Sequence, residues 1–178
     1  MSVPLIRELP WRSPTALARA LAAHFGPEGL VLLEGDGSPL GRRAVLGVNP
    51  LETVCCRGLP GEPQAADPFA ALRAMAERGG PWLGWLAYEA AAWVEPCVAW
   101  QGSDMATLWA VHHDPLLHFD LVERRCWLEG RDPARLEALL AVLAALPEPA
   151  VDAGGPAPEG SAGGQGPWDS PPAVASQA

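Results

Sequence analysis

The sequence contains no lysine, so all twelve of its cationic side chains are arginines. The absence of lysine excludes Schiff-base chemistry and the Gly-x-x-x-x-Gly-Lys phosphate loop. No basic run is longer than two residues and the net charge is −9, which argues against nucleic acid as a partner. No apolar run approaches the length of a membrane span, and the first residues carry no apolar signal core. These absences predict a cytoplasmic protein without a membrane partner.

Cysteine is scarce, and its spacing does not favour a metal site or a disulfide. The four cysteines are Cys55, Cys56, Cys97 and Cys126. They form no Cys-x-x-Cys motif, and the neighbouring histidines, at positions 112, 113 and 118, complete no standard zinc pattern. No serine or cysteine lies in a recognisable nucleophile elbow. We therefore predict no metal and no catalytic residues, with the cysteines acting as buried apolar side chains.

The most informative stretch is the apolar run Leu30–Leu33, which has the length of a strand and ends abruptly at Glu34. A run this apolar predicts a central strand that is buried on both faces. After a turn rich in glycine, Arg42 and Arg43 open a second strand over residues 44–48. A carboxylate at a strand end needs a cation or a donor. The simplest interpretation is therefore that Glu34 pairs with Arg42 or Arg43.

Three helices are indicated by start and stop signals with apolar faces between them. The first begins at Pro14, with Ser13 as a candidate N-cap, and ends at Gly26. Asp67-Pro68 and Asp132-Pro133 open the second and third helices, which end at residues 79–80 and at Pro147.

Short strand patterns fill most of the remaining chain, at residues 52–57, 82–88, 106–111, 116–122 and 126–129. Gly84, inside one of them, indicates a bulge or a close backbone approach. Residues 112–115 have the composition of a hairpin turn between their flanking strands. Because strands and helices do not alternate strictly, we predict an α+β fold built on antiparallel sheet.

The composition changes after Pro147. Of residues 147–178, 23 of 32 are proline, glycine, alanine or serine, and none is basic. Such a segment cannot bury enough apolar surface to offset its ordering entropy. We therefore predict one domain over residues 1–147, followed by a flexible linker or tail over residues 148–178.

Four segments carry a resemblance to a known family. They are Leu-Leu-Glu-Gly at 32–35, Gly-Arg-Arg-Ala-Val-Leu-Gly-Val-Asn-Pro at 41–50, Pro-Trp-Leu-Gly-Trp-Leu-Ala-Tyr-Glu at 81–89 and Leu-Leu-His-Phe-Asp at 116–120. In this order they resemble the N-terminal domain of component I of anthranilate synthase and of aminodeoxychorismate (para-aminobenzoate) synthase. The resemblance covers about residues 1–147 and implies an antiparallel β-sandwich with about three helices packed outside. Residues 88–96 are somewhat more similar to the para-aminobenzoate type.

The resemblance implies a role without catalysis. In that family, chorismate and magnesium bind in a separate C-terminal domain that supplies the catalytic groups. The chain is thus expected to be an N-terminal scaffold or effector-type fragment of an enzyme of tryptophan or folate biosynthesis, with no cofactor of its own. Its implied partners are the Mg²⁺-dependent chorismate-binding domain and a glutamine amidotransferase subunit. Two alternatives stay open: an autonomous amino-acid-binding regulatory module, and an unrelated β-sandwich interaction protein.

The resemblance also implies an effector site. In feedback-inhibited members, Leu-Leu-Glu-Ser and the strand after Gly-Arg-Tyr-Ser form part of a tryptophan pocket. The matching positions here are Leu33, Glu34, Gly35, Arg42, Arg43 and Ala44. Gly35, Arg43 and Ala44 replace a serine, a tyrosine and a serine, so each change removes a hydroxyl that could bond the ligand. We therefore expect tryptophan to bind weakly or not at all.

Overall fold

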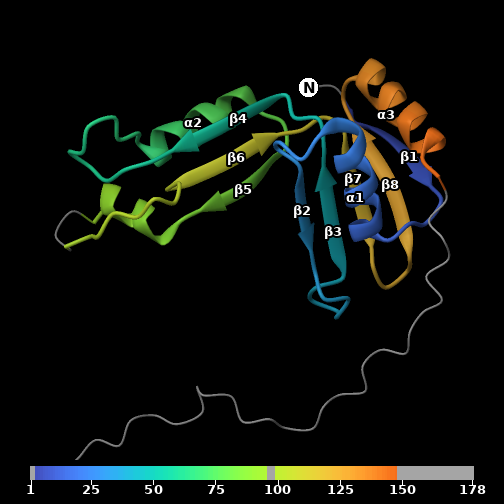
Figure 1. The fold of residues 1–178 in the computed structure, drawn as a ribbon, viewed down its shortest axis with the longest axis horizontal. Helices are drawn as coiled ribbons and strands as arrows, with labels where there is room; N and C mark the ends of the chain where they lie inside the picture. The colour runs from blue at the N-terminus through green and yellow to red at the C-terminus, as the bar shows by residue number, and fades with distance from the viewer. Residues whose placement is uncertain (1–2, 96–98, 148–178) are drawn as a thin grey trace, which may run out of the picture. The chain divides into compact units, whose positions relative to one another are not determined.

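The structure is a computed structural model that describes residues 3–95 and 99–147 (Figure 1). In this part of the chain, two antiparallel sheets combine with three α-helices and one 3-10 helix, which confirms the predicted α+β class. Residues 1–147 group into one compact unit. The segment 148–178, predicted to be flexible, and Cys97 lie outside the described residues.

The larger sheet has five strands and the smaller has three. The larger sheet is ordered β1 (Leu5–Leu9), β8 (Arg125–Gly130), β7 (Leu116–Asp120), β3 (Arg43–Gly47) and β2 (Val31–Glu34). The smaller is ordered β4 (Glu52–Cys56), β6 (Leu108–His112) and β5 (Trp82–Leu86). The helices are α1 (Pro14–Phe25), α2 (Pro68–Arg78), η1 (Tyr88–Trp93) and α3 (Pro133–Ala145). No helix among the described residues has the length and apolar character needed to span a bilayer.

Local capping chemistry sets two of the three α-helix starts. The Asp67 side chain accepts from the Phe69 backbone N–H, and the Asp132 side chain accepts from the N–H groups of Ala134 and Arg135. These are the caps that the sequence predicts. Ser13 precedes α1, but its side chain makes no capping hydrogen bond, so Pro14 at the first helical position marks this start.

Each sheet has one face covered by helix (Figure 1). In the larger sheet, residues that alternate along the strands pack against α1 and α3 to form the main core. Its most enclosed side chains include Leu21, Leu46, Leu117, Phe119 and Leu128. A smaller core, with Met75 of α2 and Leu108 of β6 among its members, lies between α2 and the three-stranded sheet. The opposite, open face of the larger sheet carries Leu33, Arg43 and Trp127.

The prediction of a central, doubly buried strand at Leu30–Leu33 is wrong. This run forms β2, which lies at the edge of the larger sheet and pairs with β3 alone. Leu33 is 48% exposed, whereas Leu32 packs against the core. Apolar content indicates a strand but does not specify its place in the sheet, because an edge strand can also bury one of its faces.

The predicted hairpin at residues 112–115 is also wrong. The strand before it, β6, belongs to the three-stranded sheet, and the strand after it, β7, belongs to the five-stranded sheet. At this crossing His113 is fully buried, and its backbone N–H donates to the Pro81 carbonyl at 3.3 Å. Turn composition indicates a change of direction without fixing which strands pair.

Two further differences concern element ends. The sequence gives no clear signal for β1 at the sheet edge, because its polar residues Arg7 and Glu8 interrupt the apolar pattern of a strand. The strand predicted over residues 82–88 ends at Leu86, and Tyr88 begins η1. Gly84 meets the prediction of a close backbone approach, because a Cβ there would lie 2.0 Å from the Trp109 carbonyl oxygen.

Candidate functional site

The six predicted effector residues lie at the end of β2, in the following loop and at the start of β3. Glu34 pairs with Ala44 in the ladder, and Leu33 pairs with Val45. Because side chains alternate along a strand, Leu33 and Arg43 belong to one face of the sheet, and Glu34 and Ala44 to the other. The six residues therefore lie around one loop, but their side chains are divided between the two faces of the sheet.

The two residues on the helix-covered face have local roles. Ala44 is 2% exposed and belongs to the main core, so a larger polar side chain there would enter a packed interior. Glu34 accepts a hydrogen bond of 3.0 Å from the Thr15 hydroxyl at the start of α1. Glu34 makes no ion pair within residues 3–95 and 99–147, so the predicted pairing with Arg42 or Arg43 is wrong. A hydroxyl donor from α1 takes that place.

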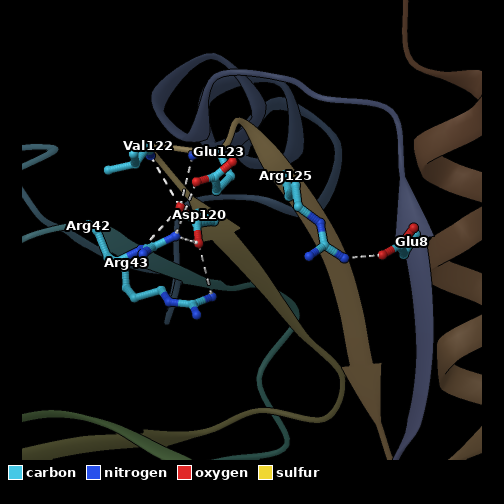
Figure 2. A network of polar contacts seen from close by, with 7 residues as sticks. All are labelled: Glu8, Arg42, Arg43, Asp120, Val122, Glu123 and Arg125. Carbon is cyan, nitrogen blue, oxygen red and sulfur yellow. Dashed lines mark hydrogen bonds and ion pairs between the residues drawn. The ribbon is translucent and has the colours of Figure 1, made fainter. Parts of the chain in front are cut away.

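Arg42 instead binds Asp120, at the end of β7 (Figure 2). Its Nη2 atom lies 2.5 Å from Asp120 Oδ2, and its Nε atom donates to Oδ1 at 3.3 Å. The two contacts form the fork geometry typical of an arginine and a carboxylate. The backbone reinforces the pair, because the Leu121 N–H donates to the Arg42 carbonyl at 2.8 Å.

Asp120 is the centre of this network. It is 5% exposed, and its Oδ1 atom also accepts from the N–H groups of Val122 and Glu123, at 3.2 and 3.0 Å. Arg43 adds a second cation, 3.7 Å from Oδ2. The hydrogen bond from Arg42 and that from the Glu123 backbone hold the pKa of Asp120 below its usual range. The same bond raises the pKa of Arg42, so both groups are charged at neutral pH.

The open face of the sheet places aromatic and charged groups beside this network. The guanidinium carbon of Arg43 lies over the ring of Trp127 in β8, 5.3 Å from the ring centroid. Trp127 also stacks on His118, with the two ring centroids 5.4 Å apart. His118 also lies 3.8 Å from Glu129. A shallow hollow of about 420 Å³ covers this region and is lined by both signs of charge, with Arg43 and Glu129 among its members.

The surroundings of His118 favour its neutral form. Burial lowers its pKa, and Arg43 lowers it further, whereas Glu129 opposes the shift. The hollow thus combines the aromatic surface of Trp127 with fixed charges, and His118 stacks on that tryptophan beside it. No group of three or more potential ligand side chains in the described part of the chain is arranged to hold a metal ion. The arrangement suits binding or packing, and it offers no nucleophile with a base.

The loop between β2 and β3 explains the glycine at position 35. Gly35 lies so close to Gly41 that an added Cβ would be 2.1 Å from the Gly41 carbonyl oxygen. The loop is closed by its own hydrogen bonds, from Gly37 N–H to the Gly41 carbonyl at 3.0 Å and from Ser38 N–H to Asp36 Oδ1 at 2.9 Å. Gly35 therefore does more than omit a hydroxyl, because it permits this tight loop.

Replacing Gly35 with serine, the residue at this position in the resembling family, should destabilise the protein. The new side chain would meet backbone atoms, so the loop must shift, at a cost of about 1–2 kcal/mol in the free energy of unfolding. Chemical denaturation measures this cost. Leu40→Ser, which adds a hydroxyl at a fully exposed position of the same loop, is the comparison. An unchanged or raised stability of Gly35→Ser would show that the loop has room for the side chain.

The sequence analysis missed Asp120 and Trp127 as members of this cluster. The signal for Asp120 was present, because it follows the mostly apolar residues 116–119 much as Glu34 follows its own apolar run. The same argument about a strand-end carboxylate applied to it. Trp127 gave no comparable signal, because Arg43, whose guanidinium lies over its ring, is far away in the sequence.

Comparison of the chain with models of known protein families and with curated proteins gave no match.

Proposed function

We propose that this chain is the non-catalytic N-terminal scaffold or effector-type domain of a chorismate-utilising synthase that forms anthranilate or 4-amino-4-deoxychorismate in the cytoplasm. One observation carries the proposal. Three of the four segments with the family resemblance form the adjacent strands β7, β3 and β2. Within them, Arg42 of the second segment binds Asp120 of the fourth. The resemblance therefore falls on residues that depend on one another physically.

We assign this chain a role without chemistry of its own. The charged residues of the candidate site are paired with one another, and no metal-ligand cluster occurs in the described residues. Chorismate chemistry in the resembling family needs Mg²⁺ and acid–base groups, which the proposal assigns to a separate catalytic domain. A glutamine amidotransferase subunit is the second proposed partner of the complete enzyme.

The open face of the larger sheet is the surface we assign to contact with the catalytic domain. It carries the exposed side chains of Leu33 and Ile6, at opposite edges of the sheet, with the hollow and its paired charges near Ile6. Exposed apolar groups beside fixed, mutually neutralised charges are typical of interdomain surfaces, which are part apolar and part polar.

The proposal predicts that the chain alone has no synthase activity but supports a catalytic domain. The chain is incubated with chorismate, ammonia and magnesium, with and without a chorismate-binding domain that lacks its own N-terminal domain. We expect no product above the blank from the chain alone, and a higher rate when the two are mixed. Domains from an anthranilate synthase and from an aminodeoxychorismate synthase, tested separately, identify the product type.

A pair of leucine variants tests the assigned surface. Leu33→Glu should reduce the stimulation, because it puts a charge on the open face. Leu40→Glu is the matched control, since Leu40 is fully exposed in the loop between β2 and β3. Product from the chain alone, or no stimulation of either domain, would contradict the proposal. Saturable tryptophan binding without any stimulation would favour the autonomous amino-acid-binding module instead.

A further inference from the structure

A second cavity lies on the helix-covered side of the five-stranded sheet, separate from the open-face hollow. Its volume is about 380 Å³, and α1, α3, β8 and the end of β1 contribute to its wall. Leu9, Leu17, Leu140 and Leu143 make most of this wall apolar. Ala144 also lines the cavity and is exposed, so solvent reaches the cavity on that side. A volume near the lower end of the usual 300–1,000 Å³ range suits a small ligand.

One cationic side chain, Arg12, belongs to this apolar cavity. Arg12 is half-buried, and its Nη2 atom makes a long contact of 3.4 Å to the Leu146 carbonyl oxygen at the end of α3. Among the acids in residues 3–95 and 99–147, none forms an ion pair with it. A guanidinium has five N–H donors, so most of the donor capacity of Arg12 is open to a ligand. An apolar wall with one such cation selects a molecule with an apolar body and an anionic group.

We propose that this cavity binds a small monocarboxylate with an apolar body, with the carboxylate on Arg12 and the body among the leucines of α1, α3 and β1. The site is independent of the function proposed above, because it shares no residue with the open face. A carboxylate is favoured over other anions because its two oxygens match the planar guanidinium fork. A single charge also limits the cost of desolvating the ligand head beside an apolar wall.

The thiol in the cavity wall does not compete with this ligand. Cys126 is buried, and its burial raises the pKa of the thiol to about 12. The group is therefore neutral at physiological pH and neither repels a carboxylate nor acts as a nucleophile. The cavity is consequently a site for reversible binding.

The test compares two probes of similar shape, octanoate and 1-octanol, by isothermal titration calorimetry on the full chain. We expect octanoate to bind saturably at one site per chain. Arg12→Gln should weaken octanoate binding by about tenfold or more, because a charge-assisted hydrogen bond is lost, and leave 1-octanol binding unchanged. Arg19→Gln is the control, since Arg19 is exposed on α1 and does not line the cavity.

A second variant tests the location of the site without relying on charge. Ala144→Phe places a ring in the cavity from an exposed position, so the fold should tolerate it while octanoate binding is lost. Unchanged melting temperatures in all variants confirm that losses arise at the site. The inference is overturned if octanoate shows no saturation, if Arg12→Gln and Arg19→Gln weaken binding equally, or if Ala144→Phe still binds octanoate.

Discussion

Replacing Gly47 with alanine should lower the free energy of unfolding by about 3 kcal/mol and the melting temperature by roughly 10 °C. A Cβ at this position in β3 would lie 2.4 Å from Cδ2 of the His113 ring. The ring is fully buried, and its Nδ1–H group donates to the Val48 carbonyl at 3.2 Å. The added methyl group must therefore displace a side chain that has no free space around it.

A double-mutant cycle separates this clash from a general intolerance of Gly47 to substitution. His113→Ala removes the ring, and in that background Gly47→Ala should cost little, because the new methyl group enters the vacated space. Gly102→Ala is the control and should leave the melting temperature nearly unchanged, because Gly102 is exposed and its Cβ would come within 3.3 Å only of the flexible end of the Glu62 side chain. Additive losses in the double variant would show that the contact with His113 is not the cause.

The fold favours the neutral form of His113. Burial lowers its pKa, and the nearby charges of His112 and Arg135 lower it further. A base whose pKa is lower in the folded state takes up a proton more readily on unfolding. The contribution of His113 to stability is therefore complete above its unfolded pKa of about 6.5 and declines as the pH falls below that value. The contact matters because the chain passes between the two sheets at this residue.

Replacing Asp120 with asparagine should produce the second large effect, a fall of the melting temperature on the order of 5 °C at pH 7. The amide retains the shape of the carboxylate and can still accept from the Val122 and Glu123 N–H groups. It cannot balance the charge of Arg42, whose Nη2 atom lies 2.5 Å away, or that of Arg43. Because Asp120 is 5% exposed, water can replace the lost partner only in part.

The pH dependence of this loss identifies its electrostatic origin. The pKa of Asp120 is lowered in the folded state, so its carboxylate stabilises the fold above its unfolded pKa of about 3.9. That contribution is lost as the pH falls through the folded-state pKa. The difference in melting temperature between wild type and Asp120→Asn should therefore narrow as the pH falls below about 4, for as long as both proteins remain folded.

Melting curves recorded from neutral to acidic pH test this expectation. Glu123→Gln is the control, because Glu123 is exposed and lies 4.0 Å from Arg42, so its loss should have a small effect. A gap between wild type and Asp120→Asn that stays constant with pH would show that packing, and not charge, explains the loss.

Much of the fold follows from local sequence. Asp67-Pro68 and Asp132-Pro133 cap the helices that they were predicted to open, because a cap needs only its own next three residues. Gly84 was predicted to mark a bulge or a close backbone approach, and the structure shows the close approach. The candidate site was harder to predict from the sequence. The strand pair that holds Arg42 and Arg43 was found, but the partner Asp120 lies 78 residues from Arg42.

The sequence by itself determined the α+β class, the three α-helices, the approximate positions of most strands and the absence of lysine chemistry. Periodicity and caps act over a few residues, so their signals are readable along the chain. The tertiary structure alone decided that β2 is an edge strand, that β6 and β7 belong to different sheets, and that Asp120 instead of Glu34 holds the arginines. The backbone bonds that join strands are alike for all residues except proline, so strand order depends on how the whole set of side chains packs.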